Sequence, residues 1–207
     1  MIPTSQYGGM MAENAREKLI AAIRDLILQR GYGGTSVDAI CESAGVSKGS
    51  FFHHFRSKED AANAALDDWV EMMSNASRRS GYEEEPDPLK RVLLYLDWAA
   101  GAADVSEGPK GCLLGTLALE LSDTHPDVRQ KAAAHFERWA SGIAALIQAA
   151  LGDDDPTRAH GLANHFIASI EGSLLLAKAK QDPSIVRANV DHFRRYLQQL
   201  VVRGAHG

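Results

Sequence analysis

The 207-residue sequence has few of the features that mark secreted, membrane-bound or catalytic proteins. It contains only two cysteines, Cys41 and Cys112, and their wide separation argues for free thiols in a reducing compartment rather than for a disulfide scaffold. No apolar run is long enough to span a bilayer, and the N-terminus lacks the charged and apolar regions of a secretory signal. We therefore expect a cytoplasmic protein with no membrane partner.

Motifs for catalysis and for metal binding are also missing. The sequence has no GxSxG, HExxH, Walker loop or GxGxxG after a strand, and no metal-ligand spacing. No alternating strand pattern supplies a sheet on which such sites are mounted. A thiol catalyst built from Cys112, His135 and His165 can be imagined, but nothing in their spacing supports it. We expect no catalytic residue, no metal and no cofactor, so an enzyme is the least favoured class.

Apolar residues recur at helical spacing through most of the sequence. With 45% hydrophobic residues the chain can bury a core, in one large or two small domains. Asp-Pro pairs place proline at the first position of several helices, and Ser57 with Asp60 forms an imperfect capping box. The pattern predicts an all-α fold, with long helices over residues 13–29, 58–79, 88–103, 111–121, 124–151, 156–180 and 183–203.

The stretch TSVDAICESAGVSKGSFFHHFRSKE, residues 35–59, predicts two short helices joined by a tight turn. Thr35 or Ser36 can cap the first helix, Gly45 tolerates the positive φ that ends it, and Ser47 can cap the second. The second helix carries polar side chains where a core helix would be apolar. Its N-terminal face is therefore free to meet a partner, and DNA is the natural candidate.

This stretch, with REKLIAAIRDLILQRGYGGTSVDAI before and within it, resembles the signature of TetR-family transcriptional repressors over roughly residues 13–60. The family's recognition helix reads close to KG[ST]LYHHFxSKE, and this chain has Phe52 where the family usually has Tyr. A hydrogen bond from a phenol to a phosphate is therefore missing. The resemblance implies a DNA-reading surface on the second helix, with phosphate contacts beside it from Thr35, Ser36 and Lys58. The residues of the reading surface are Ser47, Lys48, Gly49, Ser50, Phe51, Phe52, His53 and His54.

The resemblance also implies a domain plan and a function. It places a helix-turn-helix DNA-binding domain over residues 13–57 and a helical effector-binding and dimerisation domain over 58–207. The polar, glycine-containing start of the chain has no periodicity and predicts a disordered arm over residues 1–12. The expected function is that of a repressor that leaves a palindromic double-stranded DNA operator when a small molecule or a reactive electrophile acts on the second domain. The alternative is a helical protein-interaction module that does not bind DNA.

The net charge of −5 is unusual for a DNA-binding protein. Residues 1–60 contain seven Lys and Arg against seven Asp and Glu, so this part is neutral and the rest of the chain carries the negative charge. DNA binding must then depend on where the charges lie, with Lys48, Lys58, His53 and His54 on one surface.

The second half of the sequence mixes aromatic and polar side chains on apolar helices, as ligand cavities do. Each of these residues has an alternative role in an ordinary core. The candidates for an effector pocket are Tyr95, Trp98, Cys112, His135, Phe136, Trp139, His165, Phe166 and Glu171.

Cys112 carries a separate hypothesis. The segment GCLL, with ALELSD after it, is similar to the branch of the family that includes regulators of reactive-electrophile reduction, in which a cysteine at this point can act as the sensor. The start of a helix and the ammonium of Lys110 or Lys178 would favour the thiolate form of Cys112. The alternative is an inert cysteine that packs as a small hydrophobe.

The last two predicted helices carry apolar stripes that need a partner. The stripes can form an intramolecular core or a four-helix interface in a two-fold homodimer, and the resemblance favours the homodimer because a helix-turn-helix gains affinity by pairing on two half-sites. The expected interface residues are Phe166, Ile170, Leu174, Val190, Phe193, Leu197 and Leu200.

Overall fold

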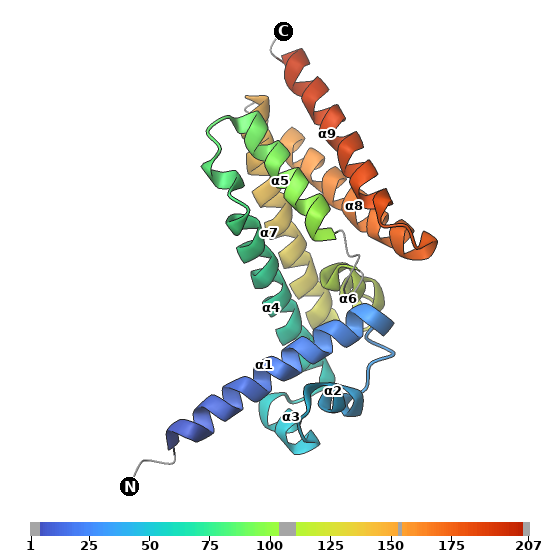
Figure 1. The fold of residues 1–207 in the computed structure, drawn as a ribbon. Coiled ribbons are helices and arrows are strands. Elements are labelled where there is room, and N and C mark those ends of the chain that lie inside the picture. The colour runs from blue at the N-terminus through green and yellow to red at the C-terminus, as the bar shows by residue number, and fades with distance from the viewer. Residues whose placement is uncertain (1–4, 104–110, 153–154, 205–207) are drawn as a thin grey trace. The chain divides into compact units, whose positions relative to one another are not determined.

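The computed structural model describes residues 5–103, 111–152 and 155–204, and within these ranges it contains helices and no strand (Figure 1). The predicted all-α fold is therefore confirmed. The elements are α1 (Ser5–Arg30), α2 (Val37–Ala44), α3 (Lys48–His54), α4 (Lys58–Arg79), the 3₁₀ turn η1 (Tyr82–Glu84), α5 (Pro88–Ala103), α6 (Leu113–Leu121), α7 (Pro126–Leu151), α8 (Pro156–Lys180) and α9 (Ser184–Gly204).

Proline and its preceding residue set the start of several helices, as predicted. Helices α5, α7 and α8 begin at Pro88, Pro126 and Pro156, where the missing N–H of proline costs no hydrogen bond. The Asp155 carboxylate caps α8 by accepting a hydrogen bond from the N–H of Thr157 at 2.9 Å.

Four helix starts differ from the prediction. Two of the shifts are small, because α7 begins at Pro126 instead of Thr124 and α9 at Ser184 instead of Pro183. Helix α1 begins at Ser5 instead of Glu13, so residues 5–12, which were expected to belong to a disordered arm, are helical. Residues 5–12 contain no proline that would interrupt a helix. Each residue added to the N-terminal end of α1 therefore gains one backbone hydrogen bond. Helix α6 begins at Leu113. It is not buried on all sides, because the side chain of Leu119 is 83% exposed. Residues 1–4 and the loop expected over 104–110 lie outside the described residues.

The chain forms two compact units. Unit 1 contains the described residues up to Glu71 together with Leu113–Ala132, and unit 2 contains those of Met72–Cys112 and those from Ala133 onward. The expected domain boundary at residue 58 therefore differs from the observed division. Residues 58–71 belong to unit 1, with Ala62 and Leu66 fully buried there.

In unit 1, α1 packs against α2, α3 and α6. The side chains of Ile23, Ile27, Ile40 and Phe51 are completely buried and fix the position of the two short helices, which are too short to be stable alone.

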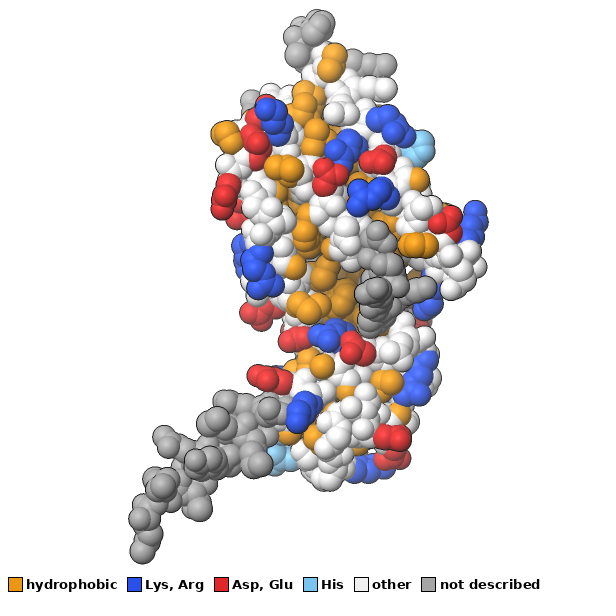
Figure 2. All heavy atoms as spheres, viewed as in Figure 1, with side chains coloured by type: hydrophobic (Ala, Val, Ile, Leu, Met, Phe, Trp, Pro, Cys, Tyr) orange, Lys and Arg blue, Asp and Glu red, His pale blue; other side chains and the backbone are white. Residues whose placement is uncertain are grey.

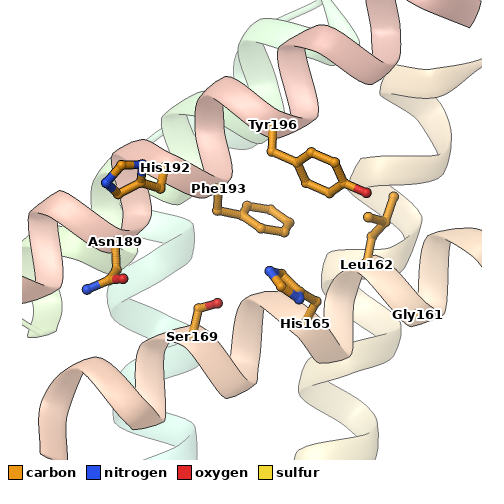
Figure 3. A pocket seen from close by; sticks show the side chains of 8 residues that line it. All are labelled: Gly161, Leu162, His165, Ser169, Asn189, His192, Phe193 and Tyr196. Carbon is orange, nitrogen blue, oxygen red and sulfur yellow. The ribbon is translucent and has the colours of Figure 1, made fainter. Parts of the chain in front are cut away.

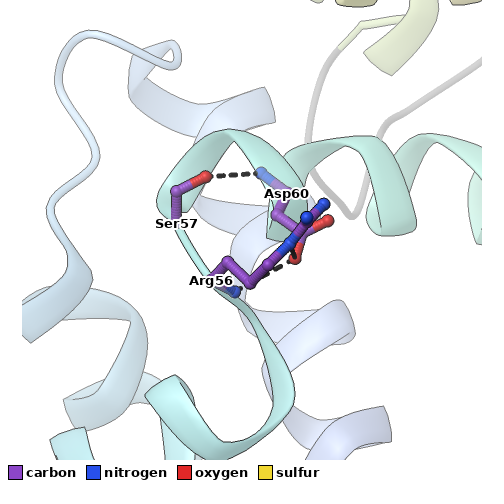
Figure 4. Close-up of polar contacts among 3 residues, drawn as sticks. All are labelled: Arg56, Ser57 and Asp60. Atoms are coloured by element: carbon purple, nitrogen blue, oxygen red, sulfur yellow. Dashed lines mark hydrogen bonds and ion pairs between the residues drawn. The ribbon is translucent and has the colours of Figure 1, made fainter.

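The start of α4 is capped by a small polar cluster, which Figure 4 shows. The Ser57 hydroxyl accepts a hydrogen bond from the N–H of Asp60 at 3.1 Å, and the Asp60 carboxylate accepts one from the N–H of Arg56 at 3.0 Å. The reciprocal bond thus goes one residue further back than in a standard capping box. The hydrogen bond from the Arg56 backbone lowers the pKa of Asp60 and keeps this cap charged.

In unit 2, α8 packs along α9, and α5 packs against α9 and η1 (Figure 1). The core between these helices includes Tyr95, Leu96, Phe166 and Phe193, all of which are buried. Among the described residues, no helix combines the length and the apolar character needed to cross a membrane.

Candidate nucleic-acid interface

Helices α2 and α3 form a helix-turn-helix with side-chain caps at both helix starts. The Ser36 hydroxyl accepts a hydrogen bond from the N–H of Ala39 at 3.2 Å, and the Ser47 hydroxyl accepts one from the N–H of Ser50 at 3.1 Å. Gly45 ends α2 with φ 66°, a left-handed conformation that a residue with a Cβ adopts only at a cost. The direction of α3 is therefore set by the protein itself, without a bound partner.

One face of α3 is open to solvent. Phe52 is 52% exposed, although its ring still contacts the edge of Phe51 with 5.2 Å between centroids. Ser50 and His54 are half-buried at the margin of this face. We call the exposed face the α3 surface, and its members are Ser47, Lys48, Gly49, Phe52 and His53.

The ammonium of Lys48 is paired with an acid. Lys48 Nζ lies 2.8 Å from the carboxylate of Asp38 on α2, and both side chains are more than half exposed. The hydrogen bond to Asp38 raises the pKa of Lys48. Exposed ion pairs of this kind contribute little stability, so a phosphate can replace Asp38 as the partner of Lys48.

A second group of basic side chains lies at the C-terminal end of α3. The rings of His53 and His54 meet edge to face, with 5.0 Å between centroids, and the guanidinium of Arg16 lies 5.5 Å from the ring centre of Phe55. Burial lowers the pKa of His54, and the neighbouring His53 and Arg16 add to this effect. His54 is therefore mostly neutral near pH 7 in the free protein.

Three residues expected at DNA lie elsewhere. Phe51 is completely buried and belongs to the core. Thr35 is 1% exposed, and its hydroxyl donates a hydrogen bond to the carbonyl oxygen of Gly31 at 2.8 Å. Lys58 donates hydrogen bonds to the carbonyl oxygens of Tyr32 and Thr35, each at 2.9 Å, and its burial lowers its pKa. These corrections have one cause: all three side chains stabilise the small core that carries the helix-turn-helix.

Charges of both signs are mixed on the visible face of the chain. On the face shown in Figure 2, Lys and Arg side chains lie among Asp and Glu instead of forming one broad basic patch. Contact with a polyanion must therefore depend on a few well-placed groups such as those of the α3 surface.

In unit 2, five of the nine predicted pocket residues form one aromatic cluster. The indole N–H of Trp139 donates a hydrogen bond to the Tyr95 hydroxyl at 2.7 Å, and the Tyr95 ring contacts those of Trp98 and Phe166, with centroids 5.5 Å and 6.5 Å apart. Phe136 stacks on Trp139. Burial raises the pKa of Tyr95, so its phenol stays protonated. The cluster offers aromatic surface and one polar pair.

Cys112 and Glu171 form a pair of their own. Cys112 is half-buried directly before α6, and its thiol donates a hydrogen bond to the Glu171 carboxylate. Burial raises the pKa of Glu171, and this hydrogen bond partly opposes the rise. Among the described residues, the thiol thus has an acid, Glu171, as a partner. Lys178 is exposed, and Lys110 lies outside the described residues.

A groove of about 610 Å³ lies between α8 and α9. His165 from α8 and Phe193 and Tyr196 from α9 point into the space between the two helices (Figure 3). His165, predicted to line an effector pocket, lines this groove, and its imidazole stacks on the ring of Phe193 with 5.7 Å between ring centroids. Among the other pocket candidates, His135 is buried.

The apolar stripes expected at a dimer interface are mostly inside unit 2. Phe166, Ile170, Val190, Phe193 and Leu197 are each at least 96% buried within one chain, and Leu174 and Leu200 pack on the same core. The five buried residues thus belong to the core of one chain, and Leu174 and Leu200 stay partly exposed beside it. The large apolar side chains that α8 and α9 leave exposed are Leu175, Leu176, Tyr196 and Val202.

Three contributors to unit 1 were not predicted from the sequence: Asp38, Arg16 and Glu120. Asp38 and Lys48 are ten residues apart, and only the turn between α2 and α3 brings them together. Glu120 did carry a signal, because it is the single charged residue of the apolar α6.

Among the described residues, no group of three or more His, Cys, Asp or Glu side chains could hold a metal ion. The candidate sites of the described residues are the exposed α3 surface in unit 1 and the aromatic cluster in unit 2.

Comparison with known proteins agrees with this arrangement. Residues 19–65 match the family of bacterial regulatory proteins called the tetR family, and residues 88–192 match the C-terminal domain of LmrA/YxaF-like transcriptional regulators. The chain is 31% identical to an HTH-type transcriptional regulator in the lacX 3′ region of Lactococcus lactis, over 86% of this chain and 90% of the relative. It is 30% identical to the HTH-type transcriptional repressor NemR of Escherichia coli, over 67% of each chain.

A solved structure is also similar. The crystal structure of the regulatory protein TetR from Rhodobacter sphaeroides has a TM-score of 0.78 and 27% identity, and the match covers 87% of this chain and 97% of that one. These relatives are transcriptional regulators and not enzymes. The protein is thus a DNA-binding transcriptional regulator that belongs to the TetR family.

Proposed function

We propose that the protein is a cytoplasmic repressor that binds a palindromic operator and leaves it when a small molecule or a reactive electrophile acts on unit 2. The observation that carries the proposal is the α3 surface, where Ser47, Lys48 and Gly49 follow one another at the start of α3 and are all exposed to solvent. These groups suit phosphate oxygens and base edges in a major groove. The named repressor among the relatives supports repression over activation.

The effector acts on unit 2, and Cys112 is the group that can report on an electrophile. The supporting observation is its hydrogen bond to Glu171, whose raised pKa makes that carboxylate a better proton acceptor than an ordinary one. When the sulfur attacks the β-carbon of an α,β-unsaturated aldehyde, a C–S bond forms and the double-bond electrons move towards the carbonyl oxygen. The thiol proton passes to Glu171 and is then returned to the α-carbon.

The active form is a homodimer whose interface is the outer face of α8 and α9. The groove beside Tyr196 and the exposed leucines Leu175 and Leu176 support this face, because all of them lie on the two helices and remain uncovered in one chain. A two-fold pair of reading helices fits an operator with two half-sites.

The regulatory role is tested with a reporter gene placed behind the DNA upstream of this protein's own gene. Expression of the wild type should lower reporter output, and an α,β-unsaturated aldehyde should restore it. Cys112→Ser should repress but stop responding to the aldehyde, and Glu171→Gln should respond more slowly. Full release of Cys112→Ser by the aldehyde would remove Cys112 as the sensor and leave a non-covalent effector.

The dimer is tested by the mass in solution, which should be twice the 22.4 kDa of the chain. Leu176→Glu should give monomers, because it places a charge on the proposed interface. The matched control is Leu94→Glu, which changes a leucine of similar exposure on α5 and should leave the dimer intact. Equal masses for the two variants would rule out this face.

The competing function is a helical interaction module without DNA binding. It predicts no change in reporter output with the wild-type protein, and no effect of substitutions on the α3 surface.

A further inference from the structure

The turn between α1 and α2, residues 31–35, is held between an acid and a base that come from distant parts of the sequence. The carboxylate of Glu120 on α6 accepts hydrogen bonds from the N–H groups of Tyr32 at 3.0 Å and of Gly33 at 2.9 Å. On α4, the ammonium of Lys58 donates hydrogen bonds to the carbonyl oxygens of Tyr32 and Thr35. Two N–H groups of this turn thus donate to a carboxylate, and two of its carbonyl oxygens accept from an ammonium.

The backbone of the turn is shaped around the carboxylate. Gly31 has φ 80°, and a Cβ at this position would lie 2.5 Å from Glu120 Oε1. A side chain there would displace the carboxylate, so glycine is needed both for the backbone conformation and for the space.

The ring of Tyr32 adds to this arrangement. Lys58 Nζ lies 3.8 Å from the centre of the ring, within range of a cation–π interaction, and the imidazole of His125 meets the ring edge to face with 5.9 Å between centroids. The turn is thus fixed by charged hydrogen bonds and by ring contacts.

The position of this turn determines where α2 starts. Thr35 is the last residue of the turn, and Ser36 directly after it caps α2. From α2 the chain passes through the Gly45 turn to Ser47, the cap of α3. A shift of the turn would therefore be passed to the α3 surface through only a few residues of ordered backbone.

We infer that Glu120 is a positioning residue for DNA recognition: its carboxylate holds the α1–α2 turn so that α3 is presented in the orientation that fits the operator. Glu120 acts through the turn and does not touch DNA. The inference rests on the proposed DNA binding.

The direction in which DNA affinity changes when the charge of Glu120 is removed distinguishes a positioning role from a purely electrostatic one. Removal of a negative charge from a DNA-binding unit should strengthen binding to a polyanion by Coulomb attraction alone. Loss of the positioning contact should weaken it. In Glu120→Gln the amide nitrogen is a donor, so one of the two N–H groups loses its acceptor and the other keeps only a neutral one.

The test measures binding of the full-length protein to its own upstream DNA by fluorescence anisotropy at several salt concentrations. Glu120→Gln should bind about ten-fold more weakly, which is the loss expected for one charge-assisted hydrogen bond. Its salt slope should equal that of the wild type because no phosphate contact is lost. The matched control is Asp123→Asn, which removes the same charge from an exposed residue three positions later and should bind at least as tightly as the wild type.

A second measurement does not depend on DNA. Amide hydrogen exchange should be faster at Tyr32 and Gly33 in Glu120→Gln than in the wild type, while the amides of the α8–α9 core are unchanged. If the wild type fails to bind DNA, the proposed function fails, and the exchange rates still show whether Glu120 holds the turn.

Three results would overturn the inference: affinity of Glu120→Gln equal to or above that of the wild type, a changed salt slope, or unchanged exchange at the two amides. If Glu120→Gln does not fold, Glu120→Asp, which keeps the charge but draws the carboxylate back by one methylene, is measured in the same way. Wild-type affinity of that variant with unchanged exchange would equally refute the role.

Discussion

Lys48 and Lys58 are expected to respond in opposite ways to the same substitution, although both were predicted from the sequence to contact phosphates. Lys48 is 57% exposed and held only by Asp38, so it is available to DNA. Lys58 is partly buried and donates two hydrogen bonds to backbone carbonyls of the α1–α2 turn. Lys→Met at each position removes the charge and nearly preserves the side-chain length.

The expected magnitudes follow from these contacts. Lys48→Met should lower the slope of log affinity against log salt by about 0.9, the value for one lost phosphate contact, and should leave folding stability nearly unchanged. Lys58→Met deletes two charge-assisted hydrogen bonds of about 1.5–3 kcal/mol each. Because the site is partly hydrated, we expect a loss of about 3 kcal/mol, or a fall in Tm of about 6–12 °C for a chain of this size.

Anisotropy titrations at four salt concentrations, combined with thermal unfolding, distinguish the two lysines. The reasoning is refuted if Lys58→Met lowers the salt slope by about one unit while its Tm stays at the wild-type value, because Lys58 would then be a phosphate contact. It is equally refuted for Lys48 if Lys48→Met keeps the full slope.

Three further substitutions on the reading unit test its chemistry. Burial and its basic neighbours lower the pKa of His54 in the free protein, and a phosphate would raise it. Binding therefore takes up a proton, and affinity should rise as pH falls towards the lowered pKa of His54. His54→Gln should flatten that pH profile. Phe52→Tyr should tighten binding about 3-fold by adding a hydrogen bond to phosphate, and an unchanged affinity would show that the ring faces no phosphate. Asp38→Asn should also tighten binding, because Lys48 loses its competing partner; weaker binding would mean that Asp38 itself reads the DNA.

Much of the fold could be predicted because its signals are local. Proline starts, the capping serines Ser36 and Ser47, and the glycine at position 45 depend on the backbone within a few residues, and the structure has them where the pattern put them. The start of α1 was missed because helix propagation through Gly8 and Gly9 is not visible in the periodicity.

The side-chain assignments that were wrong depend on packing. Phe51 and Phe52 are neighbours in an apolar segment, and only the packing of α3 on α1 decides that Phe51 is buried and Phe52 is exposed. For the same reason, the stripe with Phe166 and Phe193 was predicted at a dimer interface but lies between α8, α9 and α5. Periodicity shows that a face is buried but not which element covers it.

Residues far apart in sequence were the hardest to predict. The bonds from Glu120 to the Tyr32 region span 88 and 87 positions, and no local pattern connects them. The one available sign was that Glu120 is the single charged residue of the apolar α6, and this sign does not name its partner.

The central claim is that the α3 surface binds an operator as a homodimer, and the most direct test is the stoichiometry and salt dependence of binding to the DNA upstream of the protein's own gene. We expect saturable binding with two protomers for each operator duplex, competition by unlabelled operator but not by scrambled DNA, and affinity that falls steeply as salt is raised. Binding that does not distinguish operator from scrambled DNA at any salt concentration would contradict it.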